Sequence, residues 1–410
     1  MQNRLLLVFW ILVSTLLVPV SSKAAEGNVN ALIATPTASA TSQPHTSIPK
    51  SPTIASPTLP ALDKLLTHLV DGAIRPLYQE ADEAAKQLVK QSDEFCQTPT
   101  EVSFKALREQ WGRTMLAWQR TDALAFGPAL EQQRDFHINF SPPKKLVINR
   151  LLADSNPLTL ETLVKAGVGG QGLSTLEFLL FDRGKADAGQ LAAFQGETGK
   201  RRCAYVQTAS QLLQQDIHTV ASAWLSNAAD SYATAFKQAD QGNAHFASTQ
   251  QAIDTIIAKL YQSAEKTAKT RIGKPLGKTL NVNTEHNQVM QIPANAYELE
   301  GWRSGYSLAM ARANVEGIQR ILRDGGLFAW LREQNPQQVG QFVAQAMQVQ
   351  LENYLNLPVP TTDAFTLIEQ GKSKELEGYY YLGNGIHMSI KRQLAKILKT
   401  PLGFSENDGD

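Results

Sequence analysis

The sequence predicts an all-α protein. From Leu62 onward, apolar residues recur at spacings of three and four, close to the 3.6-residue repeat of a helix. No run alternates with a period of two over a length that would indicate a sheet. About eight helices are expected, which suits two up-and-down four-helix bundles packed together better than one large core. We expect the first bundle over residues 61–243 and the second over residues 244–410.

The N-terminus has the features of an export signal. Arg4 supplies a short positive region, residues 5–20 form an apolar run without a charge, and residues 22–24 (SKA) provide the small residues that signal peptidase needs. We expect residues 1–24 to be cleaved, which leaves a periplasmic or cell-envelope protein with no transmembrane span. An uncleaved membrane anchor is the alternative, because the apolar run falls only slightly short of a full span.

The segment that follows the leader predicts a disordered tether. Residues 25–60 are rich in Ala, Thr, Ser and Pro and have hardly any charge or aromatic side chain, so they cannot bury enough apolar surface to fold alone. Loss of the two cations Arg4 and Lys23 with the leader takes the formal net charge from +1 to −1. This balance offers no broad basic surface for nucleic acid or anionic lipid.

Two cysteines remain after the leader, Cys96 and Cys203. An even pair in an oxidising compartment predicts a disulfide that closes a loop of about a hundred residues. Two buried free thiols are the alternative. Neither arrangement provides a metal site or a catalytic nucleophile, since the sequence has no Cys-x-x-Cys.

The helices of the first half are expected in the following order. A helix that starts near Leu65 is kinked at Pro76 and continues toward Phe95, and a second opens at Pro99-Thr100 and ends at Gly127-Pro128. Further helices are expected over residues 158–166, 174–181 and 199–225.

The second half is expected to hold four strong helices and one functional loop. The helices are centred on residues 253–261 and span residues 297–322, 336–355 and 374–399. The Gly/Pro/Asn-rich segment at residues 273–293 is a candidate functional loop, because long structureless connections are uncommon inside compact domains.

The sequence around Ser174 and Glu177 has two explanations. Ser-x-x-Glu before an apolar run is the capping-box signature, in which Ser174 accepts from the Glu177 amide and Glu177 reaches back. The alternative is ligand contact, and both hold if the helix N-terminus faces the site. Gly172 is then a position that the backbone requires to lack a side chain.

A second group of candidate site residues comprises Glu300, Arg303 and Ser304 on the helix expected at residues 297–322. Arg303 suits a carboxylate or phosphate ligand, whereas an exposed intrahelical pair of Glu300 with Arg303 is the alternative. Arg134 and Asp135, in the loop after Gly127-Pro128, either line the cleft or face solvent.

Several short motifs occur in order along nearly the whole chain after the leader. They are residues 95–100 (FCQTPT), Trp111, Trp118, Gly127-Pro128, residues 172–181 (GLSTLEFLLF), 274–277 (KPLG), 300–305 (EGWRSG) and 402–404 (LGF), and Asp408-Gly409-Asp410. As an ordered set they resemble the imelysin-like family.

The resemblance implies two four-helix bundles with a ligand site between them, export, and an association with iron uptake. It implies a site formed by Gly172, Ser174, Glu177, Glu300, Arg303, Ser304, Arg134 and Asp135. The expected ligand is iron, an iron chelate or a small anion, with Glu177 and Glu300 as the metal-binding carboxylates. Other envelope iron-uptake proteins are expected as partners, and the cofactor class that the resemblance implies is iron or another divalent or trivalent metal ion.

The chain departs from the family's Gly-x-His-x-x-Glu motif at one position, where Ser174 replaces the histidine. A serine hydroxyl is a poor ligand for a transition metal that prefers imidazole. The family also carries a peptidase label, yet this sequence has no His-Glu-x-x-His and no inverted version of it. We therefore predict a non-enzymatic periplasmic binding protein in iron handling. The alternatives are a metallopeptidase of the insulin-cleaving type and a structural or adaptor protein of the cell envelope.

Overall fold

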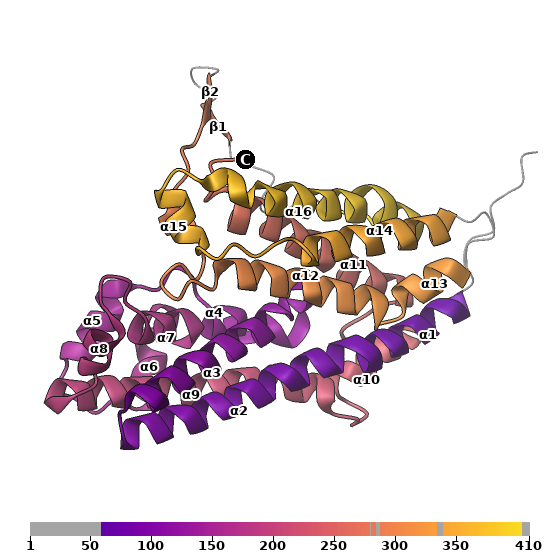
Figure 1. The fold of residues 1–410 in the computed structure, drawn as a ribbon. Helices are drawn as coiled ribbons and strands as arrows, with labels where there is room; N and C mark the ends of the chain where they lie inside the picture. The colour runs from indigo at the N-terminus through magenta and orange to yellow at the C-terminus, as the bar shows by residue number, and fades with distance from the viewer. Residues whose placement is uncertain (1–58, 279, 284–287, 334–338, 404–410) are drawn as a thin grey trace, which may run out of the picture. The chain divides into compact units, whose positions relative to one another are not determined.

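Helices make up most of the chain, as the apolar periodicity predicts (Figure 1). The computed structural model describes residues 59–278, 280–283, 288–333 and 339–403. The predicted leader, nearly all of the predicted tether, and the pair Asp408 and Asp410 lie outside the described residues. No helix in the described ranges is both long and apolar enough to cross a membrane.

The elements of the first half begin with two helices that are joined by a π-helical turn. In order they are α1 (Leu59–Leu69), η1 (Val70–Ile74), α2 (Arg75–Gln97), α3 (Glu101–Gln119), η2 (Asp122–Leu124), η3 (Gly127–Ala129), η4 (Glu131–Gln133), α4 (Arg134–Ile138), α5 (Lys145–Ala153), α6 (Leu160–Ala166), η5 (Val168–Gly170), α7 (Gly172–Leu180), α8 (Asp187–Ala192), α9 (Gly196–Leu225), α10 (Tyr232–Lys237) and η6 (Ala239–Gln241).

The elements of the second half include one short hairpin. In order they are α11 (Thr249–Glu265), η7 (Lys266–Gly273), β1 (Leu280–Asn283), β2 (Gln288–Gln291), η8 (Ala296–Glu298), α12 (Ser307–Arg323), α13 (Leu327–Glu333), α14 (Val339–Leu355), α15 (Ala364–Glu369), η9 (Ser373–Leu376), α16 (Glu377–Ser389), η10 (Ile390–Leu394) and α17 (Ala395–Leu398).

Local sequence explains where several helices start. Pro76 has no N–H to donate, and the predicted kink takes the form of the π-helical turn η1 just before it. Thr100 caps α3 and forms a capping box with Ser103, as the predicted start at Pro99-Thr100 requires. The long helix α9 begins at Gly196, close to the predicted start at residue 199.

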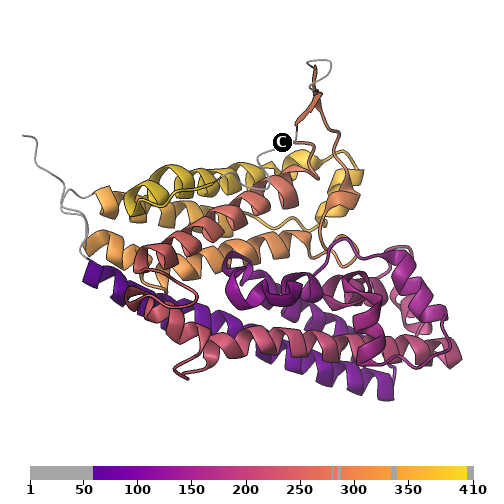
Figure 2. The same ribbon diagram turned by 180° about the vertical axis from the view of Figure 1, so that it is seen from behind.

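Two expectations about element boundaries are wrong, and a segment expected as a structureless loop contains two strands. The helix that begins after Thr100 ends at Gln119 and not at Gly127-Pro128, because a 3-10 turn follows it. The helix expected from residue 297 begins only at Ser307, because Gly301 and Gly305 adopt positive φ angles of 70° and 78° that a right-handed helix does not allow. The segment at residues 273–293 contains the antiparallel hairpin β1–β2, which stands clear of the helices in both views (Figures 1 and 2).

The helices pack in two groups. In the first, α2 contacts α3 and α9, and α7 contacts both α3 and α9; in the second, α11 contacts α12 and α16, and α14 contacts both α12 and α16. Residues Ser56–Asp410 form one compact unit, so the proposed division into two bundles near residue 243 stays a prediction.

The two helix groups meet where α3 contacts α12. A Cβ atom at Gly317 of α12 would lie 2.0 Å from the carbonyl oxygen of Arg120, so this approach requires glycine. The segment after α3 and the turn before α12, which both carry residues of the central site described below, lie at the ends of these two contacting helices.

The disulfide is confirmed: Cys96, near the end of α2, is bonded to Cys203 in α9, with 5.5 Å between their Cα atoms. The bond closes a loop of 107 residues and lies within the first helix group. Neither described cysteine is free for other chemistry.

Candidate functional site

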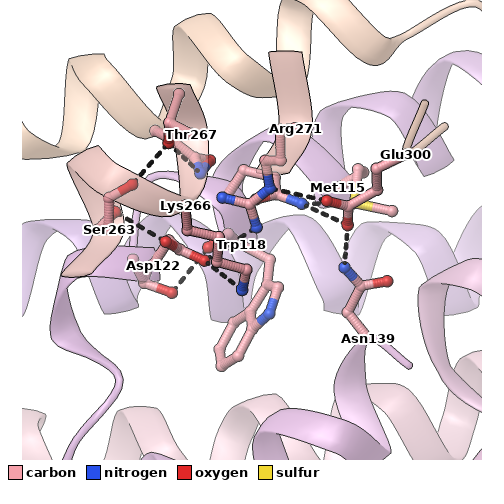
Figure 3. A network of polar contacts seen from close by, with 12 residues as sticks. Met115, Trp118, Asp122, Asn139, Ser263, Lys266, Thr267, Arg271 and Glu300 are labelled. Atoms are coloured by element: carbon pink, nitrogen blue, oxygen red, sulfur yellow. Dashed lines mark hydrogen bonds and ion pairs between the residues drawn. The ribbon is translucent and has the colours of Figure 1, made fainter. Parts of the chain in front are cut away.

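A network of charged side chains lies where the segment after α3 meets η7 and the turn at residues 299–306 (Figure 3). Its centre is Arg271, which is 7% exposed. Arg271 Nε donates to Glu300 Oε2 at 2.8 Å, and Arg271 Nη2 donates to Asp122 Oδ1 at 3.0 Å. One guanidinium group therefore joins a carboxylate of the first half to a carboxylate of the second.

Glu300 has two further donors, both from the first half. Asn139 Nδ2 donates to Glu300 Oε1 at 2.7 Å, and Gln119 Nε2 donates to the same oxygen at 3.1 Å. Ser174 Oγ donates to Asn139 Oδ1 at 2.8 Å, so Ser174 reaches Glu300 through the Asn139 amide. Both carboxylate oxygens of Glu300 are thus occupied by donors.

Asp122 is held in a similar way. Ser263 Oγ donates to Asp122 Oδ2 at 2.7 Å, and Lys266 Nζ lies 3.4 Å from Asp122 Oδ1. Burial alone would raise the pKa of Asp122, but Arg271 and Lys266 outweigh burial and hold this pKa well below its usual range. The pKa of Glu300 is lowered for the same reasons, and the two carboxylates in turn raise the pKa of Arg271. The pairing of Arg271 with Asp122 and Glu300 therefore favours the charged form of all three groups.

The network forms part of the wall of a cavity of ≈ 410 Å³, the central cavity. Aromatic side chains line it together with the charged groups, and both halves of the chain contribute. Its lining includes Tyr78, Trp118, Asp122, Asp135, Phe136, Asn139, Phe140, Lys266, Arg271, Lys274, Glu298 and Glu300.

Glu177 is buried beside this network but lines neither the central cavity nor the second cavity described below. The Ser304 backbone N–H and the Ser304 hydroxyl both donate to Glu177 Oε1, at 2.9 and 2.8 Å. The capping box predicted for Ser174 and Glu177 is wrong: α7 is preceded by Gln171 at its N-cap, and no side chain caps it. Glu177 instead fixes the turn at residues 299–306 against α7.

Burial raises the pKa of Glu177, and the two bonds from Ser304 only partly oppose this effect. A raised pKa in the folded state means that folding stability increases as the pH falls through the folded-state pKa toward the unfolded-state pKa. Glu177→Gln keeps an oxygen that can accept both bonds and removes the buried charge. We expect its free energy of unfolding at pH 8 to equal or exceed that of the wild type, whereas Glu177→Ala should lose about 1–3 kcal/mol.

Urea unfolding at pH 8 and pH 6 checks this prediction. The stability difference between Glu177→Gln and the wild type should shrink as the pH falls. A Glu177→Gln variant that is as unstable as Glu177→Ala would contradict the assigned role.

Gly172 allows a close backbone approach, and Arg303 packs on an aromatic ring. Gly172 has a φ of 77°, and a Cβ atom there would lie 2.4 Å from the carbonyl oxygen of His137, so only glycine lets α7 begin against this segment. Arg303 does not form the expected helical pair with Glu300, because residues 299–306 are a turn and Glu300 is bound by Arg271. The Arg303 guanidinium instead lies over the Trp302 ring, 4.2 Å from its centroid.

Of the predicted neighbours Arg134 and Asp135, only Asp135 lies at the central cavity. Asp135 lines the central cavity, whereas Arg134 does not and bonds the Glu131 carbonyl and the Gln132 side chain. The cavity thus contains Glu300 and Asp135 from the predicted set.

The residues that sequence reasoning missed are Arg271, Asp122, Asn139 and Gln119. A signal was present for Arg271, because Ala264, Ala268 and Ile272 form a buried helical stripe and Arg271 falls on it. Charged residues on such a stripe are rarely buried unless paired. Asp122 follows α3 at a spacing of four from Trp118, which is only partly buried but packs against the core.

The described part of the chain holds no group of three or more His, Cys, Asp or Glu side chains that could bind a metal ion. His137 lies 3.8 Å from Asp216, His218 bonds Asp82 at 3.1 Å, and His387 lies 3.6 Å from Glu265. Coordination of a metal by Glu177 and Glu300 stays a prediction.

Two solved structures share the fold. An imelysin-like protein from Psychrobacter arcticum 273-4 has a TM-score of 0.65 and 23% identity, and the match covers 86% of this chain and 100% of that one. A protein from Parabacteroides distasonis ATCC 8503, described as an iron-regulated protein A precursor, has a TM-score of 0.66 and 16% identity, with 85% and 97% covered. A search of curated proteins finds no significant match. The family model for imelysin (Peptidase_M75) matches residues 74–356, more than half of the chain, so this protein belongs to the imelysin family.

Proposed function

We propose that this chain is an exported imelysin-family protein that binds an iron chelate in the central cavity and serves iron handling without proteolysis. The observation that carries the proposal is the network of Arg271, Glu300 and Asp122 in the wall of a cavity that both halves of the chain line. Support for the iron association comes from the family and from the structural neighbour described as iron-regulated. The features of residues 1–24 support export to the periplasm or cell envelope.

The charges of the cavity favour a chelate over a bare ion. Three of its carboxylates are paired with cations: Asp122 and Glu300 with Arg271, and Glu298 with Lys274 at 3.0 Å. A bare ferric ion needs several anionic oxygens that are free to coordinate it. A polar chelate that brings its own oxygen ligands needs only hydrogen bonds and aromatic contacts, and the cavity provides both.

The bonding of the Glu300 carboxylate favours a binding protein over a peptidase. A carboxylate that an arginine and two amides hold, with a lowered pKa, is a poor general base. The metallopeptidase and the adaptor remain the competing functions, and one set of experiments separates the three.

Calorimetry with ferric nitrilotriacetate as the probe tests the proposal. We expect binding by the wild type and at least a tenfold loss of affinity in Glu300→Gln, since this change weakens the charge-assisted pair that orients Arg271 in the cavity wall. Glu316→Gln is the matched control, because Glu316 pairs with Arg120 outside the cavity lining.

The binding role would be overturned in favour of a peptidase if the purified protein cleaves insulin. This requires that a chelator abolishes the cleavage and that Glu177→Ala removes it. Absence of binding of the probe, together with no bound metal by elemental analysis, would favour the adaptor.

A further inference from the structure

A second cavity, of ≈ 560 Å³, is lined by α5, the end of α7, α9 and the turn at residues 299–306. We infer that this cavity, the basic cavity, binds a small polycarboxylate anion. It shares no lining residue with the central cavity, so the inference does not depend on the function proposed above.

The charge of the lining is strongly one-sided. Five cationic side chains line the cavity with a single carboxylate, Asp182; the cations are Lys145, Arg183, Lys185, Arg202 and Arg303. Lys185 forms an ion pair with Asp182 at 3.2 Å, and Arg183 forms one with Asp363 at 2.8 Å.

Three of the cations therefore have no carboxylate within ion-pair distance among the residues that the structure describes: Lys145, Arg202 and Arg303. Arg202 donates through Nε and Nη2 to the Leu179 carbonyl, which orients its guanidinium, while Asp182 acts on this charge only from beyond ion-pair distance. An anionic ligand would supply a bonded counterion.

Arg303 is the best-oriented of these groups. Its guanidinium lies 4.2 Å from the centroid of Trp302, and Trp302 stacks on Phe365 at 5.2 Å with an interplanar angle of 21°. An aromatic face holds the guanidinium plane and uses none of its N–H groups, so its fork stays available for a carboxylate. Burial lowers the pKa of Arg303 and nearby Glu177 opposes this, which agrees with a half-buried cation that lacks a bonded counterion.

The number of cations without a paired carboxylate, and their origin in separate segments, favours one ligand class. Lys145 comes from the start of α5, Arg202 from α9, and Arg303 from the turn at residues 299–306, so the charges surround the cavity from separate segments. A molecule with several carboxylates offers one anionic group for each of these cations. Carboxylates also match the bidentate geometry of arginine.

Calorimetry with citrate at about 0.15 M salt tests the inference. We expect citrate to bind the wild-type protein and Arg303→Gln to weaken this binding at least tenfold. The matched control is Arg150→Gln, which removes the same charge from an exposed position on α5 outside the lining and should change the affinity less than twofold because salt screens it.

Lys145→Gln is a second test that a folding defect should not confound, since the Lys145 side chain is exposed. It should weaken citrate binding by about threefold or more. Far-ultraviolet circular dichroism confirms that each variant is folded. No citrate binding up to millimolar concentration, equal losses in Arg303→Gln and Arg150→Gln, or phosphate binding as tight as that of citrate would each overturn the inference.

Discussion

Replacing Arg271 by methionine is expected to lower the free energy of unfolding by about 3–5 kcal/mol at pH 7. The substitution removes the cation that Asp122 and Glu300 share and leaves two largely buried carboxylates with too little compensation. Urea unfolding, followed by circular dichroism, measures the loss. Arg320→Met is the matched control, because Arg320 makes a similar two-point pair with Glu80 at the surface, and we expect a loss of less than about 1 kcal/mol.

The stability of Arg271→Met should also depend on pH in a different way from that of the wild type. In the wild type, Arg271 holds the pKa values of Asp122 and Glu300 below those of the unfolded chain, so their contribution to stability is lost as the pH falls through the folded-state values. In Arg271→Met, burial without the guanidinium raises both pKa values, so that stability increases as the pH falls from 7 toward 5. The deficit of the variant should therefore shrink in acid. A constant deficit from pH 7 to pH 5 would show that lost packing, and not charge, causes the effect.

Loss of the Cys96–Cys203 bond is expected to cost about 5 kcal/mol, because the unfolded chain is released from a closed loop of 107 residues. Guanidinium chloride unfolding of the oxidised wild type and of the double variant Cys96→Ser/Cys203→Ser measures the difference. The bond links α2 to α9, the two helices that form the main contact of the first helix group.

A reductant provides the control for this prediction. Dithiothreitol should bring the wild type to the stability of the double variant and leave the double variant unchanged. A loss of less than about 1 kcal/mol would indicate that the reduced chain already keeps these two helices together in its denatured state.

The sequence predicts the long helices well because their periodicity is a local property. The stripe of α9 extends over many turns, and its expected end at Leu225 is found. The start of α12 is predicted wrongly because the apolar and charged residues from Tyr297 to Arg303 have helix-compatible spacing. The turn with its two positive-φ glycines is instead held by the distant Glu177, which accepts two bonds from Ser304.

The site is predicted only in part, for a related reason. Glu300 and Ser174 are named from motifs, yet what Glu300 does is decided by Arg271, 29 residues earlier in the chain, and by Asn139, 161 residues earlier. Asp122 and Arg271 are 149 positions apart. Such pairings are set by how helices pack, and the spacing of residues within one helix holds no information about them.

Arg271 also has a consequence for how ligand binding and helix packing influence each other. Its two carboxylate partners come from opposite halves of the chain, and the same side chains form the wall of the central cavity. A molecule that fits this wall only while the halves are docked adds its binding free energy to their docking, and by thermodynamic reciprocity any partner that tightens the docking raises the affinity for that molecule. A ligand that contacts both halves of this wall would therefore couple its occupancy to the mutual arrangement of the halves.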